Sequence, residues 1–381
     1  MCRSFAGSST MGQEGLPVRS RAFVLVVLCV CLIAASRQSG VSVKSGEIET
    51  ALARLSPIDA HAHVYNSSPR FSQLLDRLNM RLVNICVVDL HDPGFEKAEP
   101  QHAKALELFR QSRGRWAWCS TFDPRDWEKA GSAERVKRDL DSTFKNGAVA
   151  VKIYKDIGME LRSRSGRYLM PDDPVFAPIL EFVESRGKTL YAHIAEPTAA
   201  WKPLDPKSPH YSYYKANPDW HMYLHPERPA KETILAARDR LLERHPKLRV
   251  VGAHLGSMED DVDQIARRLD RYPNFVVDTA ARVPDLMIQP REKVRAFMTK
   301  YQDRVLYATD LVLMATDNPD RAVTRWEEEY LRDWKYFATD QTVVYRDYKV
   351  KGLALPEPIL AKLYRLNAEK WVPGQKSIPS D

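Results

Sequence analysis

The stretch that decides the fold of this chain is Ile58-Asp59-Ala60-His61-Ala62-His63-Val64, a strand-length run that carries two histidines two residues apart. Residues two apart on a strand point to the same face, so both imidazoles can reach one ion. Three further apolar runs of similar length end on His193, His254 and Asp310. Parallel strands that deliver such side chains at their carboxyl ends describe a barrel with a metal in its mouth.

Eight strand-like segments alternate with helix-like segments over residues 55–375. The strand candidates are rich in Val, Ile, Tyr and Trp, and several are continuously apolar, as strands buried on both faces are. They cover residues 56–61, 82–90, 115–122, 148–154, 189–194, 249–254, 274–279 and 305–310. Amphipathic helices are expected between them, for example over 229–245 and 259–272, and a last one over 358–371. Eight such units predict the α/β class and a (β/α)8 TIM barrel. A doubly wound sheet usually has fewer strands and places ligands at one switch point.

Three connections are too long for plain barrel loops, and all three leave the C-terminal face of the predicted barrel. They cover residues 155–173, 195–230 and 311–355. Long loops in a compact domain are usually lids or binding loops. The second is dense in aromatic residues and proline, and Trp201 is our candidate for substrate contact there. A satellite core that covers the barrel edge is an equally good interpretation of this aromatic connection.

The first 36 residues have the character of a signal peptide. Arg19 and Arg21 precede an apolar run over residues 22–35, which is short for a membrane span and right for a signal sequence. The small residues Ala34 and Ser36 favour cleavage after Ser36. We therefore expect an exported protein, periplasmic or extracellular, with residues 37–54 as a tether and no stable membrane insertion once the leader is removed. An uncleaved membrane anchor is the alternative.

The net charge limits the classes of binding partner, and the cysteine content limits the residue types that can form the metal site. The net charge of +7 is spread along the chain, so we expect a small-molecule substrate and no nucleic-acid partner. A homo-oligomer is compatible with the sequence. Outside the leader the chain keeps Cys86 and Cys119, which we expect as buried free thiols, with a disulfide as the alternative. No Cys-x-x-Cys pair exists, so the metal site must be built from histidine and carboxylate.

The chemistry of the five strand-end residues suggests a division of roles. His61, His63, His193 and Asp310 would hold a divalent ion, which lowers the pKa of bound water toward ~7. Asp310 could also take a proton from that water. His254 would be a further ligand or a proton shuttle and oxyanion partner. One such residue alone is weak evidence, but their conjunction at four predicted strand ends predicts a metal site.

Other polar residues near these strand ends carry less specific signals. Lys152 lies in the fourth apolar run, and a buried lysine is costly unless it is paired or modified. It could be a carbamylated lysine that bridges two metals, a cation for a substrate carboxylate, or a residue that only points into the polar barrel mouth. Asp59 could orient a ligand imidazole or only help to close the strand. Tyr154 and Arg282 are candidate substrate-binding residues, Arg282 as an anion binder.

The motif set resembles the amidohydrolase superfamily, and within it the amidohydrolase-related group that also contains metal-dependent decarboxylases. The resemblance covers about residues 57–371 and is most specific at Ile58–His63, Gly252–Gly256, Tyr307–Asp310 and Asn367–Trp371. It implies a (β/α)8 barrel with one or two divalent ions, most often zinc. It also implies that His61, His63, His193 and Asp310 are ligands and that His254 is the strand-six histidine. Members with two metals often carry a carbamylated lysine on strand four, where Lys152 falls, and many mononuclear members lack it.

These observations lead to three functional hypotheses. The leading one is a metal-dependent hydrolase that uses activated water to cleave a C–O or C–N bond. The nearest alternative is a non-oxidative decarboxylase of an aromatic or unsaturated acid, which the aromatic connection and Lys152 would suit. The third is a non-catalytic exported binding protein in which the metal has only a structural role. The presence of all five site residues argues against this hypothesis.

Overall fold

The computed structural model describes residues 45–92, 94–125 and 127–375. The expected signal peptide and residues 37–44 of the expected tether lie outside them. The second half of that expected tether is instead helix α1 (Ser45–Arg54). Its Leu52 is fully buried and the helix packs against α13 (Pro319–Ala338). The packed domain therefore begins earlier than residue 55.

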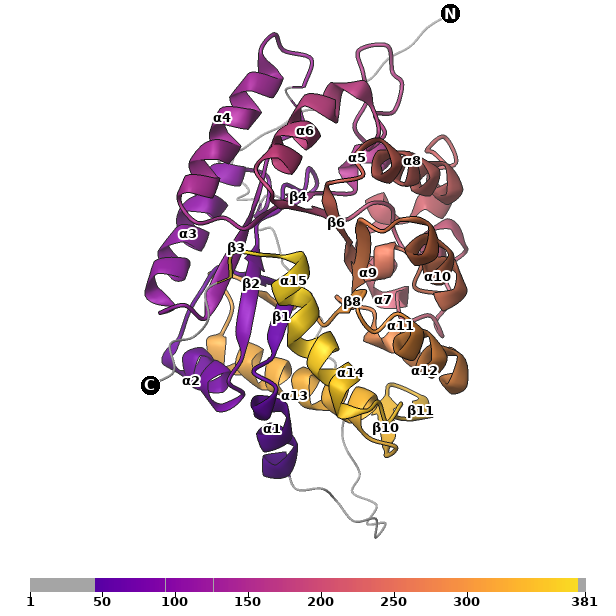
Figure 1. The fold of residues 1–381 in the computed structure, drawn as a ribbon. Helices are drawn as coiled ribbons and strands as arrows, with labels where there is room; N and C mark the ends of the chain where they lie inside the picture. Colours follow the sequence, from indigo (N-terminus) through magenta and orange to yellow (C-terminus); the bar gives the residue numbers. More distant parts are fainter. Residues whose placement is uncertain (1–44, 93, 126, 376–381) are drawn as a thin grey trace, which may run out of the picture. The chain divides into compact units, whose positions relative to one another are not determined.

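Eight parallel strands follow one another around a barrel, each hydrogen-bonded to the next in chain order (Figure 1). All eight expected strands are confirmed, and their inner and outer faces are almost entirely buried, as in a sheet covered by helices. Their bounds are β1 (Ile58–Val64), β2 (Arg81–Ile85), β3 (Trp116–Thr121), β4 (Ala150–Ile153), β5 (Thr189–Ala192), β6 (Arg249–Gly252), β7 (Phe275–Asp278) and β8 (Val305–Leu306).

The barrel closes through an eighth strand that is interrupted in its middle. β8 pairs with β7, and the chain then continues into β9 (Val312–Leu313), which pairs in parallel with β1. Between them the Ala60 amide donates to the Tyr307 carbonyl at 3.0 Å and the Asp310 amide donates to the His61 carbonyl at 2.8 Å. The interruption coincides with Asp310, whose φ of 63° is left-handed and breaks the strand. The eighth strand is therefore shorter than residues 305–310.

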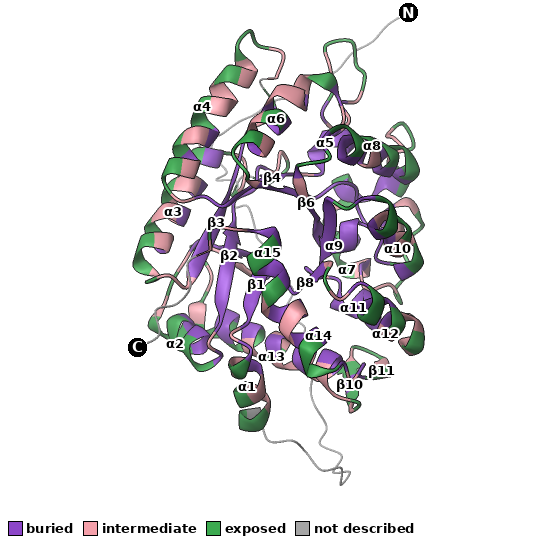
Figure 2. Cartoon of the chain, in the orientation of Figure 1, coloured by how far each residue is buried: buried purple, intermediate pink, exposed green. Residues whose placement is uncertain are grey.

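Helices on the outside of the barrel bury one face and expose the other (Figures 1 and 2). In α10, Asp261 caps the N-terminus by accepting from the Asp263 amide, while Val262, Ile265 and Leu269 form the buried stripe. These outer helices are α2 (Pro69–Arg77), α3 (Ala98–Gln111), α4 (Ser132–Lys145), η1 (Pro174–Phe176) with α6 (Ala177–Ser185), α8 (Lys231–Arg244), α10 (Val262–Arg271) and α12 (Arg291–Lys300). The short α11 (Val283–Met287) is buried throughout. The expected last helix is confirmed as α14 (Glu357–Ala361), a π-helical turn (Lys362–Leu366) and α15 (Asn367–Trp371).

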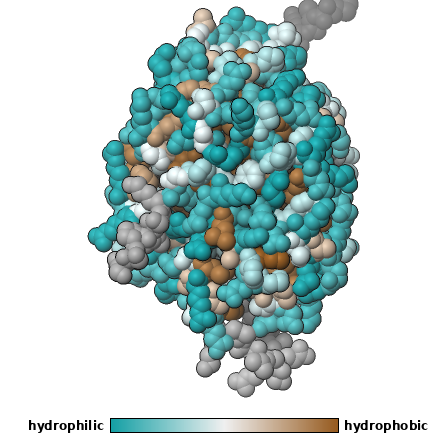
Figure 3. Space-filling model, viewed as in Figure 1, coloured by the Kyte–Doolittle hydropathy of each residue, from teal (hydrophilic) through white to brown (hydrophobic). Residues whose placement is uncertain are grey.

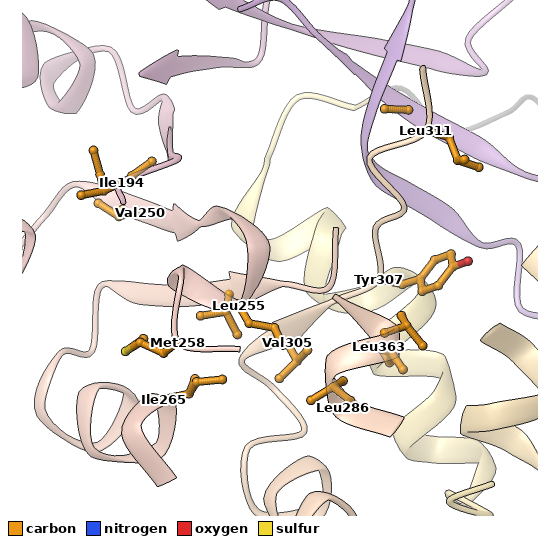
Figure 4. Close-up of a cluster of buried hydrophobic side chains, with 14 of the residues drawn as sticks. Ile194, Val250, Leu255, Met258, Ile265, Leu286, Val305, Tyr307, Leu311 and Leu363 are labelled. Atoms are coloured by element: carbon orange, nitrogen blue, oxygen red, sulfur yellow. The ribbon is translucent and has the colours of Figure 1, made fainter. Parts of the chain in front are cut away.

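The core fills the layer between strands and helices. Figure 4 shows part of it, with Val250 of β6, Ile265 of α10 and Val305 of β8, all buried. At the end of β6 the packing is so close that a Cβ on Gly252 would lie 2.5 Å from the Phe275 ring. This contact explains why glycine precedes the short turn α9 (Ala253–Gly256) that carries His254.

The three long connections differ in structure. Residues 155–173 form α5 (Asp156–Met159) and a bridge between Arg162 and Tyr168. Residues 195–230 form the short turns η2 (Thr198–Trp201), α7 (Tyr211–Ala216), η3 (Pro218–Trp220) and η4 (Met222–Leu224). The third is not a loop, because it contains the 20-residue α13 and the hairpin β10 (Thr342–Tyr345)–β11 (Tyr348–Lys351). Buried Trp326, Tyr330 and Phe337 give α13 a packed stripe that belongs to the barrel wall.

Two observations concern the rest of the described chain. Cys86 and Cys119 are buried and free, so the thiol expectation is confirmed within these residues. None of the helices in the described ranges combines the length and apolar content that a membrane crossing needs. Figure 3 shows hydrophilic residues over most of the face that carries α14 and α15, which agrees with the charged outer faces of these helices.

Candidate metal centre

The two histidines of β1 present the same ring nitrogen to the middle of the barrel mouth. His61 Nδ1 lies 2.9 Å from Asp278 Oδ2, and His63 Nδ1 lies 2.8 Å from the Ile85 carbonyl. A carbonyl and a carboxylate can only accept, so each Nδ1 carries the proton and each Nε2 keeps its lone pair. The local structure thus fixes the tautomer that a metal ligand needs.

Asp310 brings a carboxylate to these two nitrogens. Its Oδ1 lies 3.4 Å from both His61 Nε2 and His63 Nε2. The left-handed backbone at Asp310 turns the chain at this point, and the amide is held on the His61 carbonyl. Burial alone would raise the pKa of Asp310, but the imidazoles around it, His254 foremost, hold that pKa well below its usual range. In its ionised form this carboxylate can bind a cation.

His254 approaches the same point from β6 on a strained turn. Both His254 and Leu255 have left-handed φ, 58° and 57°, and the His254 amide donates to Asp278 Oδ1 at 2.7 Å. Its Nδ1 lies 2.9 Å from the Ala280 carbonyl, which leaves Nε2 free. Ligand atoms of His61, His254 and Asp310 lie within 4.8 Å of one another. Backbone strain of this kind commonly occurs at functional sites.

His193 completes the set from the end of β5. Its ring centroid lies 4.2 Å from that of His254, and its Nε2 is buried without a hydrogen-bonding partner among the described residues. Buried polar atoms are nearly always paired, so this nitrogen indicates a missing ligand. Burial holds the pKa of His61, His193 and His254 well below its usual range, which keeps their lone pairs available. The donor set and the orphaned nitrogen fit a divalent ion.

Lys152 lies at this centre rather than beside it. Its Nζ is 3.0 Å from His61 Nε2, and its side chain is fully enclosed. Burial lowers the pKa of Lys152 to about 8, against the raising effect of Asp310 and Asp278. A lysine in this position can reach either a metal or a substrate, so the bridging and carboxylate-binding interpretations both stay open.

Asp278 is the functional residue that the sequence reasoning missed. It accepts from His61 Nδ1 and from the His254 amide, so it positions two residues of the centre at once. It is fully buried, and burial raises its pKa above the usual range. A signal was present, because Asp278 ends the seventh apolar run in the same way as the other site residues end theirs.

Asp59 helps to close the barrel, which is the second of the two roles expected for it. Among the described residues it accepts from the backbone amide of His61 at 3.2 Å and from no imidazole nitrogen. Its carboxylate accepts from the Thr309 hydroxyl at 2.5 Å and from the Tyr330 hydroxyl at 3.0 Å. It therefore ties β1 to the end of β8 and to α13. Burial raises the pKa of Asp59 to about 7, although the hydrogen bonds from Thr309 and Tyr330 lower it.

A cavity of about 530 Å³ opens above the centre. Its floor holds His63, Lys152, His193, His254 and Asp310, as expected from the sequence. Its wall includes Tyr154 and Arg282, and the buried Arg282 has an Nε without a hydrogen-bonding partner in the described part of the chain. The aromatic connection contributes Tyr213 and Trp220, so it contacts the cavity directly and also packs into the core. Trp201 does not line the cavity.

Comparison with known proteins gives one family match. A model of the amidohydrolase family matches residues 58–374. No curated protein sequence matches the chain.

Several solved structures are similar to this chain. A 2,6-dihydroxybenzoate decarboxylase from Rhizobium is 16% identical, with a TM-score of 0.48 over 83% of this chain and 98% of that one. A dihydroxybenzoic acid decarboxylase from Polaromonas sp. JS666, solved with manganese and 2-nitroresorcinol, is 15% identical, with a TM-score of 0.49 over 84% and 98%. A 4-oxalomesaconate hydratase from Rhodopseudomonas palustris is 11% identical, with a TM-score of 0.44 over 84% and 96%. At these values the likenesses do not bear on the reaction.

Proposed function

Because the chain belongs to the amidohydrolase family, we propose that it is a metal-dependent hydrolase that cleaves a C–O or C–N bond of a small anionic molecule. The observation that carries this proposal is the convergence of His61 and His63 on Asp310. His193, whose ring lies 4.2 Å from that of His254, adds a buried Nε2 that has no hydrogen-bonding partner within the described ranges. One divalent ion, for which we propose zinc, would be held by His61, His63, His193 and Asp310. When bound, such an ion lowers the pKa of water and polarises a carbonyl oxygen.

The residues around the ion would transfer protons during the reaction. In its ionised form the Asp310 carboxylate can accept a proton from a water molecule in the cavity. His254 is held neutral by burial, and its Nε2 can receive a proton and pass it to a leaving group. The strained turn and the Asp278 carboxylate fix the direction in which that nitrogen points.

The cavity wall supports an anionic substrate. Arg282 is buried and lines the cavity, and its Nε has no hydrogen-bonding partner among residues 45–92, 94–125 and 127–375. A buried guanidinium with free donors is suited to bind a carboxylate or phosphate. Tyr154 stands edge-on to His193 with ring centroids 5.0 Å apart and would limit the space beside the reacting group.

Decarboxylation of an aromatic or unsaturated acid is the second candidate function. The observation that favours it is the pair of basic side chains, Lys152 on the floor and Arg282 on the wall, in one cavity with aromatic Tyr154 and Trp220. In that case the substrate carboxylate would bind at the floor. Lys152 would stay an unmodified cation, whereas a carbamylated Lys152 would instead support a second metal.

A matched substrate panel separates the two functions. Lactones, esters and amides that carry a carboxylate are compared with the parent aromatic acids, and product formation and carbon dioxide release are followed with metal-loaded enzyme. We expect hydrolysis without carbon dioxide release, and loss of activity after chelation. An Arg282→Gln variant is expected to raise KM by roughly tenfold for anionic substrates only. Carbon dioxide release without hydrolysis would establish the second function, and turnover unaffected by chelation would contradict both.

A further inference from the structure

A second group of metal-ligating side chains lies beside the metal centre. It consists of His91, in the connection after β2, together with Asp156 and Glu160, which belong to and follow α5 after β4. Each offers one ligand atom, and these atoms lie within 4.8 Å of one another. Both connections leave the carboxyl ends of their strands, and His91 lines the same cavity as the metal centre.

Asp156 is the residue that points to a missing partner. The residue is 1% exposed, and neither carboxylate oxygen accepts a well-aligned hydrogen bond from the described residues, although the Leu90 amide lies near the carboxylate. A buried carboxylate without partners costs several kcal/mol in order of magnitude unless a cation or a proton compensates it. Asp89 and Glu160 add further negative charge around it.

The basic residues near Asp156 donate their hydrogen bonds to groups other than its carboxylate. Lys155 pairs with Glu196 and donates to the Tyr213 hydroxyl at 2.9 Å. Arg228 pairs with Oε1 of Glu160 and donates to the Asp219 carbonyl at 2.7 Å. Neither of these cations forms an ion pair with Asp156 in the described chain, so its carboxylate stays uncompensated by direct contact.

The other two residues are arranged as ligands. Glu160 divides its oxygens, with Oε1 on Arg228 and Oε2 on His91 Nε2. The opposite ring nitrogen, His91 Nδ1, lies 3.8 Å from Asp219 Oδ2, which is near enough for an ion pair and too far for a direct hydrogen bond. The ring of His91 packs edge-on against Trp220 at 4.9 Å between centroids, which limits its rotation.

We propose that His91, Asp156 and Glu160 form a second divalent cation site, separate from the metal centre of His61, His63, His193 and Asp310. One imidazole nitrogen and two carboxylate oxygens suit Zn²⁺ or Mn²⁺ better than Ca²⁺, which prefers oxygen ligands only. The ion would join the connection after β2 to α5 and so fix one wall of the substrate cavity. The site does not depend on which reaction the metal centre performs.

Ion counting tests this proposal independently of activity. The full chain is stripped of metal and dialysed against micromolar Mn²⁺ or Zn²⁺, and bound metal per chain is measured by elemental analysis. We expect two ions in the wild type and one in His91→Ala and in Asp156→Asn. We expect one ion in the double variant His61→Ala/His63→Ala and none when His91→Ala is added to that pair. Asp92→Asn changes an acid that lines the same cavity outside the cluster, so it should keep two ions.

Lys152 provides the discriminating variant, because a carbamylated lysine would also supply a second ion. Lys152→Ala should leave the His91 site occupied, so His91→Ala must remove one further ion in that background. Equal ion counts in the wild type, His91→Ala and Asp156→Asn would overturn the proposal, as would saturation only at millimolar metal. Retention of the first ion and an unchanged circular dichroism spectrum show that a variant with a lower count is folded.

Discussion

Asp59 and Asp278 are two buried aspartates in barrel strands, and they hold together different regions of the molecule. Asp59 lies in β1 and binds Thr309 and Tyr330, so it belongs to the seam that closes the barrel. Asp278 ends β7 and binds His61 and His254, so it belongs to the metal centre. The comparison teaches that the donors that face a buried carboxylate decide its role, whereas its distance from histidine along the chain does not.

Among the changes considered, removal of both imidazoles of β1 should have the largest effect on the metal centre. In His61→Ala/His63→Ala, two of the four proposed ligands of the centre are lost, and turnover should fall by roughly 10³-fold or more. Elemental analysis should show the loss of the ion at this centre. Activity assays on the purified variant measure the turnover rate. An ion count equal to that of the wild type would reject the ligand assignment.

Asp278→Asn should weaken the metal centre without dismantling it. The amide cannot accept from both His61 and His254 as a carboxylate does, so metal affinity should fall by roughly 10- to 100-fold, as for other supports of metal-binding histidines. Competition with a chromophoric chelator measures the affinity. Unchanged affinity would mean that Asp278 only packs the barrel. Asp59→Asn is the matched control, for which we expect affinity within about threefold of the wild type.

The same Asp59→Asn change should act on stability instead. It puts an amide where the backbone amides of His61 and Thr309 and the hydroxyls of Thr309 and Tyr330 converge. The metal-free protein should therefore lose about 1–3 kcal/mol of unfolding free energy at pH 5. The pKa of Asp59 is raised from 3.8 to about 7, so the folded chain holds a proton that the unfolded chain releases above pH 3.8. Wild-type stability relative to the variant should therefore fall as pH rises from about 4 to 7. Denaturant unfolding across this range checks the slope, and a rising difference would contradict the assignment.

Tyr330→Phe should have the smallest effect on stability, and it should act only on the contacts between Asp59 and α13 that help to close the barrel. It removes one hydrogen bond to Asp59 from α13 and leaves the ring in the core, so we expect a loss of about 1 kcal/mol. Metal affinity and turnover should stay as in the wild type. A change in either would show that the seam and the metal centre are coupled, which would weaken the division between the two aspartates.

Residues whose signal is local lie together as the sequence predicts, while their roles as ligands stay predictions. The paired histidines in β1 and the apolar runs that end on His193, His254 and Asp310 follow from strand periodicity and from the rule that parallel strands meet at one edge. The structure brings all five into one cavity mouth. The strands themselves are confirmed for the same reason, since a strand buried on both faces must be apolar throughout.

Where a role depends on partners far along the chain, the sequence left two roles open for Asp59 and did not single out Asp278. Asp278 meets His61 across 217 positions and Asp59 meets Tyr330 across 271, so no local pattern separates their roles. The sequence predicts a long connection over residues 311–355, and the structure places helix α13 there. Its stripe of Trp326, Tyr330 and Phe337 is buried only because it packs against the barrel.

The sequence by itself determined the kind of barrel and which side chains stand at its mouth, because periodicity and strand order are properties of the chain alone. Only the tertiary structure decided which nitrogen of each histidine faces the centre and which aspartate supports it. Those choices depend on hydrogen-bonding partners such as the Ile85 and Ala280 carbonyls, which other strands bring into place.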